Sequence, residues 1–165
     1  MTEDRIELVS MLGEAEQSAL LTLNNAHARE TSFLTSEQWR QLVDRSYVAT
    51  CVQPGAALLV AFDQDAAYDS PNFLWFRERV PRFVYIDRII VADSHRGKGL
   101  AQQMYRDLFR RMQASGQDVV TCEVNIVPPN PISDKFHAGM GFAEAGQAAL
   151  PDSAKRVRYL RKRLN

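Results

Sequence analysis

The fold is decided by the stretch Ile89-Ile90-Val91-Ala92-Asp93-Ser94-His95-Arg96-Gly97-Lys98-Gly99-Leu100-Ala101. An apolar strand ends at Val91, a turn follows, and a glycine-containing loop opens a long helix. Glycine lets a backbone approach a ligand closely, and the free amides at a helix start favour an anion. With Arg96 and Lys98 beside these amides, we expect a pyrophosphate site. The alternative is an ordinary strand-to-helix turn with solvated basic residues.

Two better-known phosphate motifs are absent from this stretch. The P-loop pattern Gly-x-x-x-x-Gly-Lys-Ser/Thr is missing, and the dinucleotide pattern Gly-x-Gly-x-x-Gly fails at Gln102. The loop therefore predicts neither a nucleoside triphosphatase nor a nicotinamide enzyme.

Around this centre the hydrophobic pattern predicts an α/β domain with a mixed sheet. A helix over 99–114 has Leu100, Met104, Leu108 and Met112 at helical spacing. The other expected elements are strands near 6–9 and over 47–52, 57–62, 83–91, 119–126, 142–149 and 156–160, and helices from about 10 to 23, over 35–45 and over 131–138. We expect Asn24-Asn25 to end the first helix, a Thr35/Gln38 capping box to start the second, and 63–82 to be a long loop.

Composition narrows the class of protein. The 165 residues, 45% of them hydrophobic, suit a single domain over 1–165 with its own core. Twenty basic and 20 acidic side chains give a formal net charge of zero, so we expect no nucleic-acid partner. No apolar run approaches the roughly 20 residues that span a bilayer, and the N-terminal residues do not predict a secretory signal. Two cysteines far apart in sequence indicate reduced thiols, so we expect a cytoplasmic protein without a membrane partner.

The segment Arg96-Gly97-Lys98-Gly99-Leu100-Ala101 resembles the Arg/Gln-x-x-Gly-x-Gly/Ala signature of the GNAT acyltransferases. The later segment Phe136-His137-Ala138-Gly139-Met140-Gly141-Phe142 is similar to another conserved stretch of that family. The resemblance covers residues 83–146 and implies a splayed central sheet of about six to seven strands, flanked by about four helices. It also implies acetyl-CoA as co-substrate, with its pyrophosphate on the loop amides and its pantetheine arm along the strand before the loop. The cofactor-binding residues implied in this way are Ile89, Ile90, Val91, Arg96, Gly97, Lys98, Gly99, Leu100, Ala101, Gln102 and Asn130.

Two catalytic residues follow from the same resemblance. Glu123 stands where a family branch that acetylates ribosomal proteins has its base, and His137 stands where the family has the tyrosine that protonates the departing thiolate. The alternative for Glu123 is a salt-bridged or solvent-facing carboxylate, and for His137 a helix-surface residue that only packs against the cofactor. Asn130 comes two residues later than the family's asparagine, because Val127-Pro128-Pro129 adds length.

Other candidates have simpler interpretations. Asp87, on one strand face with Tyr85 and Ile89, is a second candidate base, but pairing with a nearby arginine is favoured. Cys122 is interpreted as packing rather than as a nucleophile, and His95 and His27 are interpreted as non-catalytic. The spacing of His, Cys and Asp residues predicts no metal site.

The resemblance implies that the acceptor binds between the first helical region and the aromatic stretch before the strand 83–91. The substrate-binding candidates are Asn24, Asn25, Asn72, Trp75 and Phe76, with the alternative that the aromatic side chains fill the edge of the core. The resemblance implies a CoA-dependent N-acyltransferase, and in particular an N-acetyltransferase that passes acetyl directly from acetyl-CoA to a small amine, an amino acid or a peptide amino group. A non-catalytic CoA-binding module and a protein-interaction domain are the alternatives, and a homodimer is left open.

Overall fold

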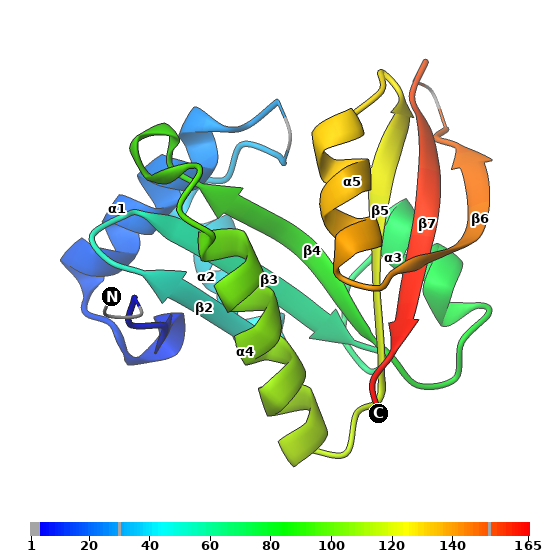
Figure 1. Cartoon of the computed structure of the whole chain (residues 1–165). Helices are drawn as coiled ribbons and strands as arrows, with labels where there is room; N and C mark the ends of the chain where they lie inside the picture. Colours follow the sequence, from blue (N-terminus) through cyan, green and yellow to red (C-terminus); the bar gives the residue numbers. More distant parts are fainter. Residues whose placement is uncertain (1–3, 30, 152) are drawn as a thin grey trace.

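A mixed seven-stranded sheet in the order β1-β2-β3-β4-β5-β7-β6 runs through the molecule (Figure 1). The computed structural model describes residues 4–29, 31–151 and 153–165. The strands are β1 (Glu7–Leu8), β2 (Val48–Val52), β3 (Ala57–Asp63), β4 (Val84–Val91), β5 (Val119–Val127), β6 (Ala143–Ala149) and β7 (Arg156–Arg163). The helices are α1 (Glu14–Ala26), α2 (Ser36–Arg45), α3 (Pro71–Arg77), α4 (Leu100–Ala114) and α5 (Pro131–Gly139), with short 3₁₀ turns at Val9–Met11 and Asp93–His95.

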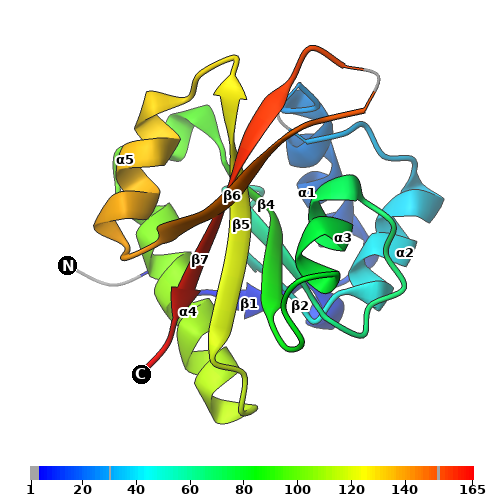
Figure 2. The same cartoon turned by 90° about the vertical axis from the view of Figure 1, so that its right-hand side faces the viewer.

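Two hydrophobic clusters, one on each face of the sheet, form the core. Helices α1, α2 and α3 cover one face, where Leu20, Trp39 and Phe73 are buried. Helix α4 covers the other face with Met104 and Leu108, and α5 packs beside it (Figures 1 and 2). None of the described helices combines the length and the apolar character of a membrane span.

Most of the predicted elements are present. The Thr35/Gln38 capping box starts α2, with Thr35 Oγ1 accepting from the Gln38 amide at 3.2 Å. Strands β2 and β3, both predicted, form an antiparallel hairpin, and Gly55 takes a φ of 55° in its turn. In the residues that the structure describes, the seven strands agree with the expected six to seven, and the five α-helices are one more than the expected number of about four.

The additional helix is α3, which lies inside the segment expected to be a loop. Residues Pro71–Arg77 form two helical turns with Pro71 at the first position, where a missing N–H costs nothing. Phe73 and Phe76 are fully buried. Three aromatic residues within four positions show no clear helical period, which is why the pattern did not indicate a helix.

A second correction concerns Asn24-Asn25, which lie inside α1 instead of ending it. Their side chains have tertiary partners that offset the low helix propensity of asparagine. The Asn25 amide both donates to the Leu34 carbonyl at 3.0 Å and accepts from the Leu34 N–H at 2.9 Å. This pair fastens the chain between α1 and α2 to the helix.

A β-bulge in β4 gives the third correction. Val60 pairs with Arg88 and Ala61 with Ile86, so Asp87 is the extra residue. Tyr85 belongs to the cluster under α1–α3, whereas Ile89 packs in the cluster under α4. The bulge therefore separates two side chains that strict alternation had placed on one face.

Candidate active site

The loop between β4 and α4 presents a row of free main-chain amides. Gly97 and Gly99 have φ values of 77° and 76°, a left-handed conformation that favours glycine. A Cβ at either position would meet nothing within 4 Å, so the space above the loop is open. In the part of the chain that the structure describes, the N–H groups of residues 97–102 have no hydrogen-bond partner, and the first helical bond at this end runs from Gln103 to Gly99.

The exposed side chains of Arg96 and Lys98 add positive charge to this row. Arg96 is held by Asp93, at 3.3 Å. Unpartnered amides at a helix start, with cations beside them, bind phosphate groups well. The predicted pyrophosphate residues, from Arg96 to Gln102, therefore lie together and fit a pyrophosphate group.

Strands β4 and β5 separate beside this loop. Within the described residues they pair only at Val84–Val120 and Tyr85–Thr121, although β4 continues to Val91 and β5 to Val127. The later main-chain groups of β4 on that side, including those of Ile89, consequently have no strand to pair with. An extended arm of a ligand can take this place, as predicted for Ile89, Ile90 and Val91.

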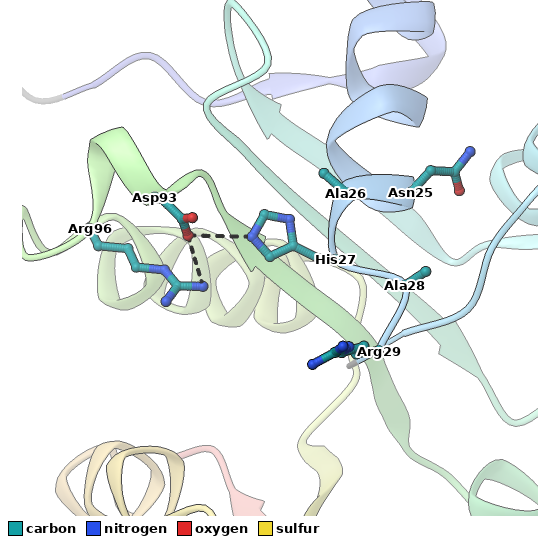
Figure 3. Close-up of a pocket in the computed structure, with 7 residues that line it drawn as sticks. All are labelled: Asn25, Ala26, His27, Ala28, Arg29, Asp93 and Arg96. Atoms are coloured by element: carbon teal, nitrogen blue, oxygen red, sulfur yellow. Dashed lines mark ion pairs between the residues drawn. The ribbon is translucent and has the colours of Figure 1, made fainter.

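A cavity of about 450 Å³ lies between the end of α1 and the β4–α4 loop (Figure 3). Asp93 stands in its wall and pairs with His27 at 3.6 Å as well as with Arg96. Asn25 and Arg29 also line the cavity. The cavity is thus lined by a predicted cofactor residue, Arg96, and by a predicted substrate residue, Asn25, and His27 also lines it.

Glu123 lies on the β5 face that is turned towards α3, and part of its side chain is exposed. Its Oε2 accepts from the Tyr85 hydroxyl at 2.7 Å, and its Oε1 accepts from Asn72 Nδ2 at 3.1 Å. Burial raises the pKa of Glu123 from 4.5 to about 8, and the negative charge of Asp87 adds to that effect. The two hydrogen bonds act against it, since they stabilise the ionised form. A carboxyl with this pKa can accept a proton near neutral pH.

Asp87 is engaged elsewhere, as its favoured interpretation expected. It accepts from Arg88 Nε at 2.7 Å and from the Tyr68 hydroxyl at 2.5 Å. The side chains of Asp87 and Arg88 are 6% and 5% exposed. Asp87 is therefore half of a buried ion pair, and its charge acts on Glu123 from there.

His137 is buried, unlike the surface residue of its alternative interpretation. Its Nδ1 donates to the Ser133 carbonyl at 2.8 Å, so its Nε2 accepts from the Tyr105 hydroxyl at 2.9 Å. Burial lowers the pKa of His137, which favours the neutral ring. Both ring nitrogens are used inside the protein, and a proton from His137 can reach a ligand only after one of these contacts breaks.

Two other predicted residues have local roles. Asn130 caps α5, where its Oδ1 accepts from the Ser133 amide at 3.2 Å. Cys122 is buried, and burial raises the pKa of its thiol well above 9, as in an unreactive packing cysteine.

The substrate-binding candidates are distributed over several environments. Asn24 is completely buried, where its Oδ1 accepts from Arg88 Nη1 at 2.8 Å, and Asn25 holds the loop after α1. Phe76 is fully buried. Trp75 is stacked between Tyr159, with ring centroids 4.1 Å apart, and the Arg79 guanidinium, 4.3 Å from its centroid. Asn72 contacts Glu123 directly, so it is the candidate nearest to the proposed base.

Sequence reasoning did not assign roles to several residues that complete the site. Tyr85 donates to Glu123, Tyr159 donates to Asn72, and Tyr105 donates to His137. Strand alternation could have placed Tyr85 on the Glu123 face, but no local pattern relates Tyr159 to α3. Among the described residues, no three His, Cys, Asp or Glu side chains come together as a metal site would require.

Comparisons with known proteins agree with this geometry. The model of the acetyltransferase (GNAT) family matches residues 55–142. The L-methionine sulfoximine/L-methionine sulfone acetyltransferase of Pseudomonas aeruginosa is 30% identical over 143 residues, which cover 82% of this chain and 79% of that protein.

Solved structures share the fold at low sequence identity. Salmonella typhimurium yncA, solved with its cofactor acetyl-CoA, is 14% identical with a TM-score of 0.69, and the match covers 99% of this chain and 95% of that one. The ribosomal-protein-S18-alanine N-acetyltransferase of Escherichia coli is 12% identical with a TM-score of 0.67, covering 98% and 94%. The free amides, the separated strands and the family match together place this chain in the GNAT family, as an N-acetyltransferase that uses acetyl-CoA.

Proposed function

We propose that this enzyme acetylates the amino group of a small, amino-acid-like acceptor and that Glu123 is its general base. The observation that carries the proposal is the partly exposed Glu123 carboxyl, with its pKa of about 8, on the strand that separates from β4. The acceptor class is supported by the relative from Pseudomonas aeruginosa, whose substrates are two methionine derivatives.

In this reaction the protein supplies proton transfer and stabilises negative charge. Acetyl-CoA supplies the thioester, and the amine nitrogen forms a bond to its carbonyl carbon while the carbon–sulfur bond breaks. An ammonium group must first lose a proton to become a nucleophile, and the ionised Glu123 takes it. A main-chain amide of β4 next to Ile89 polarises the carbonyl oxygen, and the amides of residues 97–102 hold the pyrophosphate. The nitrogen loses a second proton as the amide forms and the departing thiolate takes one, so the overall reaction releases the single proton that Glu123 passes on to solvent. His137 remains the predicted donor to the thiolate, and it can act only after its contact with the Tyr105 hydroxyl breaks.

The test is release of free CoA thiol with a panel of acceptors, for both the wild type and Glu123→Gln. The panel contains L-methionine sulfone, L-methionine sulfoximine, a diamine and an alanyl peptide. We expect the two amino-acid derivatives to be preferred, and we expect Glu123→Gln to lower kcat by about 100-fold or more with an unchanged Kd for acetyl-CoA. Equal turnover by the variant contradicts the base assignment, and preference for the peptide or the diamine contradicts the acceptor class.

The proposal also includes a single domain over 1–165 and a cytoplasmic location. One continuous order of seven strands supports the single domain. The location is supported by two buried free thiols, Cys51 and Cys122, which suit a reducing compartment.

A further inference from the structure

We propose that Asn72 is a positioning residue for Glu123, and that Tyr159 keeps the Asn72 amide in the orientation which that role requires. The proposal rests on the proposed role of Glu123 as base. Asn72 then acts on the Glu123 carboxyl, which deprotonates the amine, and does not bind the substrate as the sequence predicted.

The orientation of the Asn72 amide follows from its two partners. The Tyr159 hydroxyl donates to Asn72 Oδ1 at 3.0 Å, so the oxygen of the amide faces β7. The nitrogen then faces β5 and donates to Glu123 Oε1 at 3.1 Å. A flipped amide would set its oxygen against the carboxylate, which is unfavourable when Glu123 is ionised.

Tyr159 itself is firmly held. It is 1% exposed, and its ring lies 4.1 Å from Trp75 in a stacked arrangement and 5.3 Å from Phe76 edge to face. Trp75 fits there because Gly146 on β6 has no side chain, since a Cβ at Gly146 would lie 2.6 Å from the indole. Strands β6 and β7 therefore fix the hydroxyl that orients Asn72, far from Glu123 in sequence.

Titratable and charged groups surround Glu123 on each side. Strand β4 contributes Tyr85, which donates to Oε2, and Asp87, whose negative charge opposes ionisation of Glu123. Strand β7 contributes Tyr159, which acts through Asn72. Arg88 forms an ion pair with Asp87 at 2.7 Å. Within the described residues the hydrogen-bond donors to the Glu123 carboxyl are therefore Tyr85 and Asn72, which favour its ionised form.

The experiment compares the pH dependence of kcat, at saturating substrates, for the wild type, Asn72→Ala, Tyr159→Phe and the double variant. In the wild type, kcat rises with pH up to the pKa of Glu123. A hydrogen bond to a charged group corresponds to about one pH unit, so Asn72→Ala moves this rise upward by about one unit. The variant is then about tenfold slower at pH 7 and close to wild type near pH 10. The ionisation of the acceptor contributes equally to each variant and cancels in the comparison.

Tyr159→Phe keeps the ring on Trp75 and removes only the hydroxyl, so we expect a shift of about half a unit. In the double variant it should add nothing to Asn72→Ala, because its effect passes through Asn72. Tyr47→Phe is the matched control, because the Tyr47 hydroxyl donates to the Arg111 carbonyl and is hydrogen-bonded to the Ser115 hydroxyl near the end of α4; we expect it to leave the pH profile unchanged. The KM for acetyl-CoA stays constant in the wild type and in these four variants.

Glu123→Gln distinguishes the role of Glu123 as base from the positioning role of Asn72. If Glu123→Gln lowers kcat and changes its pH profile, while Asn72→Ala and Tyr159→Phe keep the wild-type profile, the positioning role is wrong and the base assignment stands. If Glu123→Gln keeps both the wild-type kcat and the wild-type pH profile, the base assignment itself is wrong. Should Asn72→Ala fail to fold, the shift in Tyr159→Phe decides the question alone.

Discussion

Glu123→Gln should stabilise the protein more at pH 9 than at pH 6. The folded protein raises the pKa of Glu123 from 4.5 to about 8. Between these values the folded state holds a proton that the unfolded state has lost, so the free energy of unfolding falls as the pH rises through this window. The neutral glutamine removes that dependence and keeps nearly the same shape.

The change in the free energy of unfolding depends on the pH interval over which the folded and unfolded states differ by one proton. Between pH 6 and 9 the two states differ by one proton over about two pH units, at ~1.36 kcal/mol per unit, which gives ~3 kcal/mol. Part of the Glu123 side chain reaches solvent, so we expect about 2 kcal/mol. For a chain of this length the corresponding change in Tm is about 4–8 °C.

The assay is thermal unfolding of the wild type and Glu123→Gln without acetyl-CoA, in matched buffers at pH 6 and 9. The quantity of interest is the difference between the two proteins at pH 9, minus the same difference at pH 6, because all other titrating groups cancel. An equal difference at both pH values would show that Glu123 is not desolvated in the folded state. The physical basis for its role as base would then be lost.

Three further outcomes can be measured on single variants. Gly99→Ala should weaken acetyl-CoA binding measured by calorimetry. Gly116→Ala, the control, has similar backbone strain at φ 81° but lies at the far end of α4, so it should lower only the Tm. Equal affinities of the two variants for acetyl-CoA would contradict the assignment of this loop as the pyrophosphate site. Arg88→Met leaves the Asp87 carboxylate buried without its partner and should cost about 3 kcal/mol in urea unfolding, and a loss under ~1 kcal/mol would contradict a buried ion pair. Gly146→Val inserts atoms where the indole of α3 lies and should cost about 1–3 kcal/mol, and an unchanged midpoint of unfolding would argue against that close packing.

The order of strands and the long helix α4 followed from the sequence because their signals are local. Hydrophobic period, the capping box and glycine turns each act within a few residues. Helix α3 and the continuation of α1 through Asn24 did not follow, because tertiary contacts decide them. Asn24 stays helical by binding Arg88, which is 64 positions further along the chain.

The same distinction applies to the site. The loop amides were predictable, since a glycine at a helix start defines them by itself. The environment of Glu123 was not, because its partners Tyr85 and Asn72 are 38 and 51 positions away. The single-residue bulge at Asp87 also has no signature in the strand pattern, although it decides which side chains of β4 share a face with Glu123.

The short contact between β4 and β5 has a mechanical consequence. Among the described residues, two residue pairs join the first four strands to the last three within the sheet. With so few main-chain bonds at this junction, the two parts of the sheet are held together mainly by the side chains that pack on both of its faces. The pantetheine arm of acetyl-CoA, bound between β4 and β5, would hydrogen-bond to the free edge of β4 and contact both parts of the sheet. We therefore expect the β4–β5 junction to become more rigid when the cofactor binds. Release of CoA would remove these contacts, so the junction would become more flexible again before the next turnover.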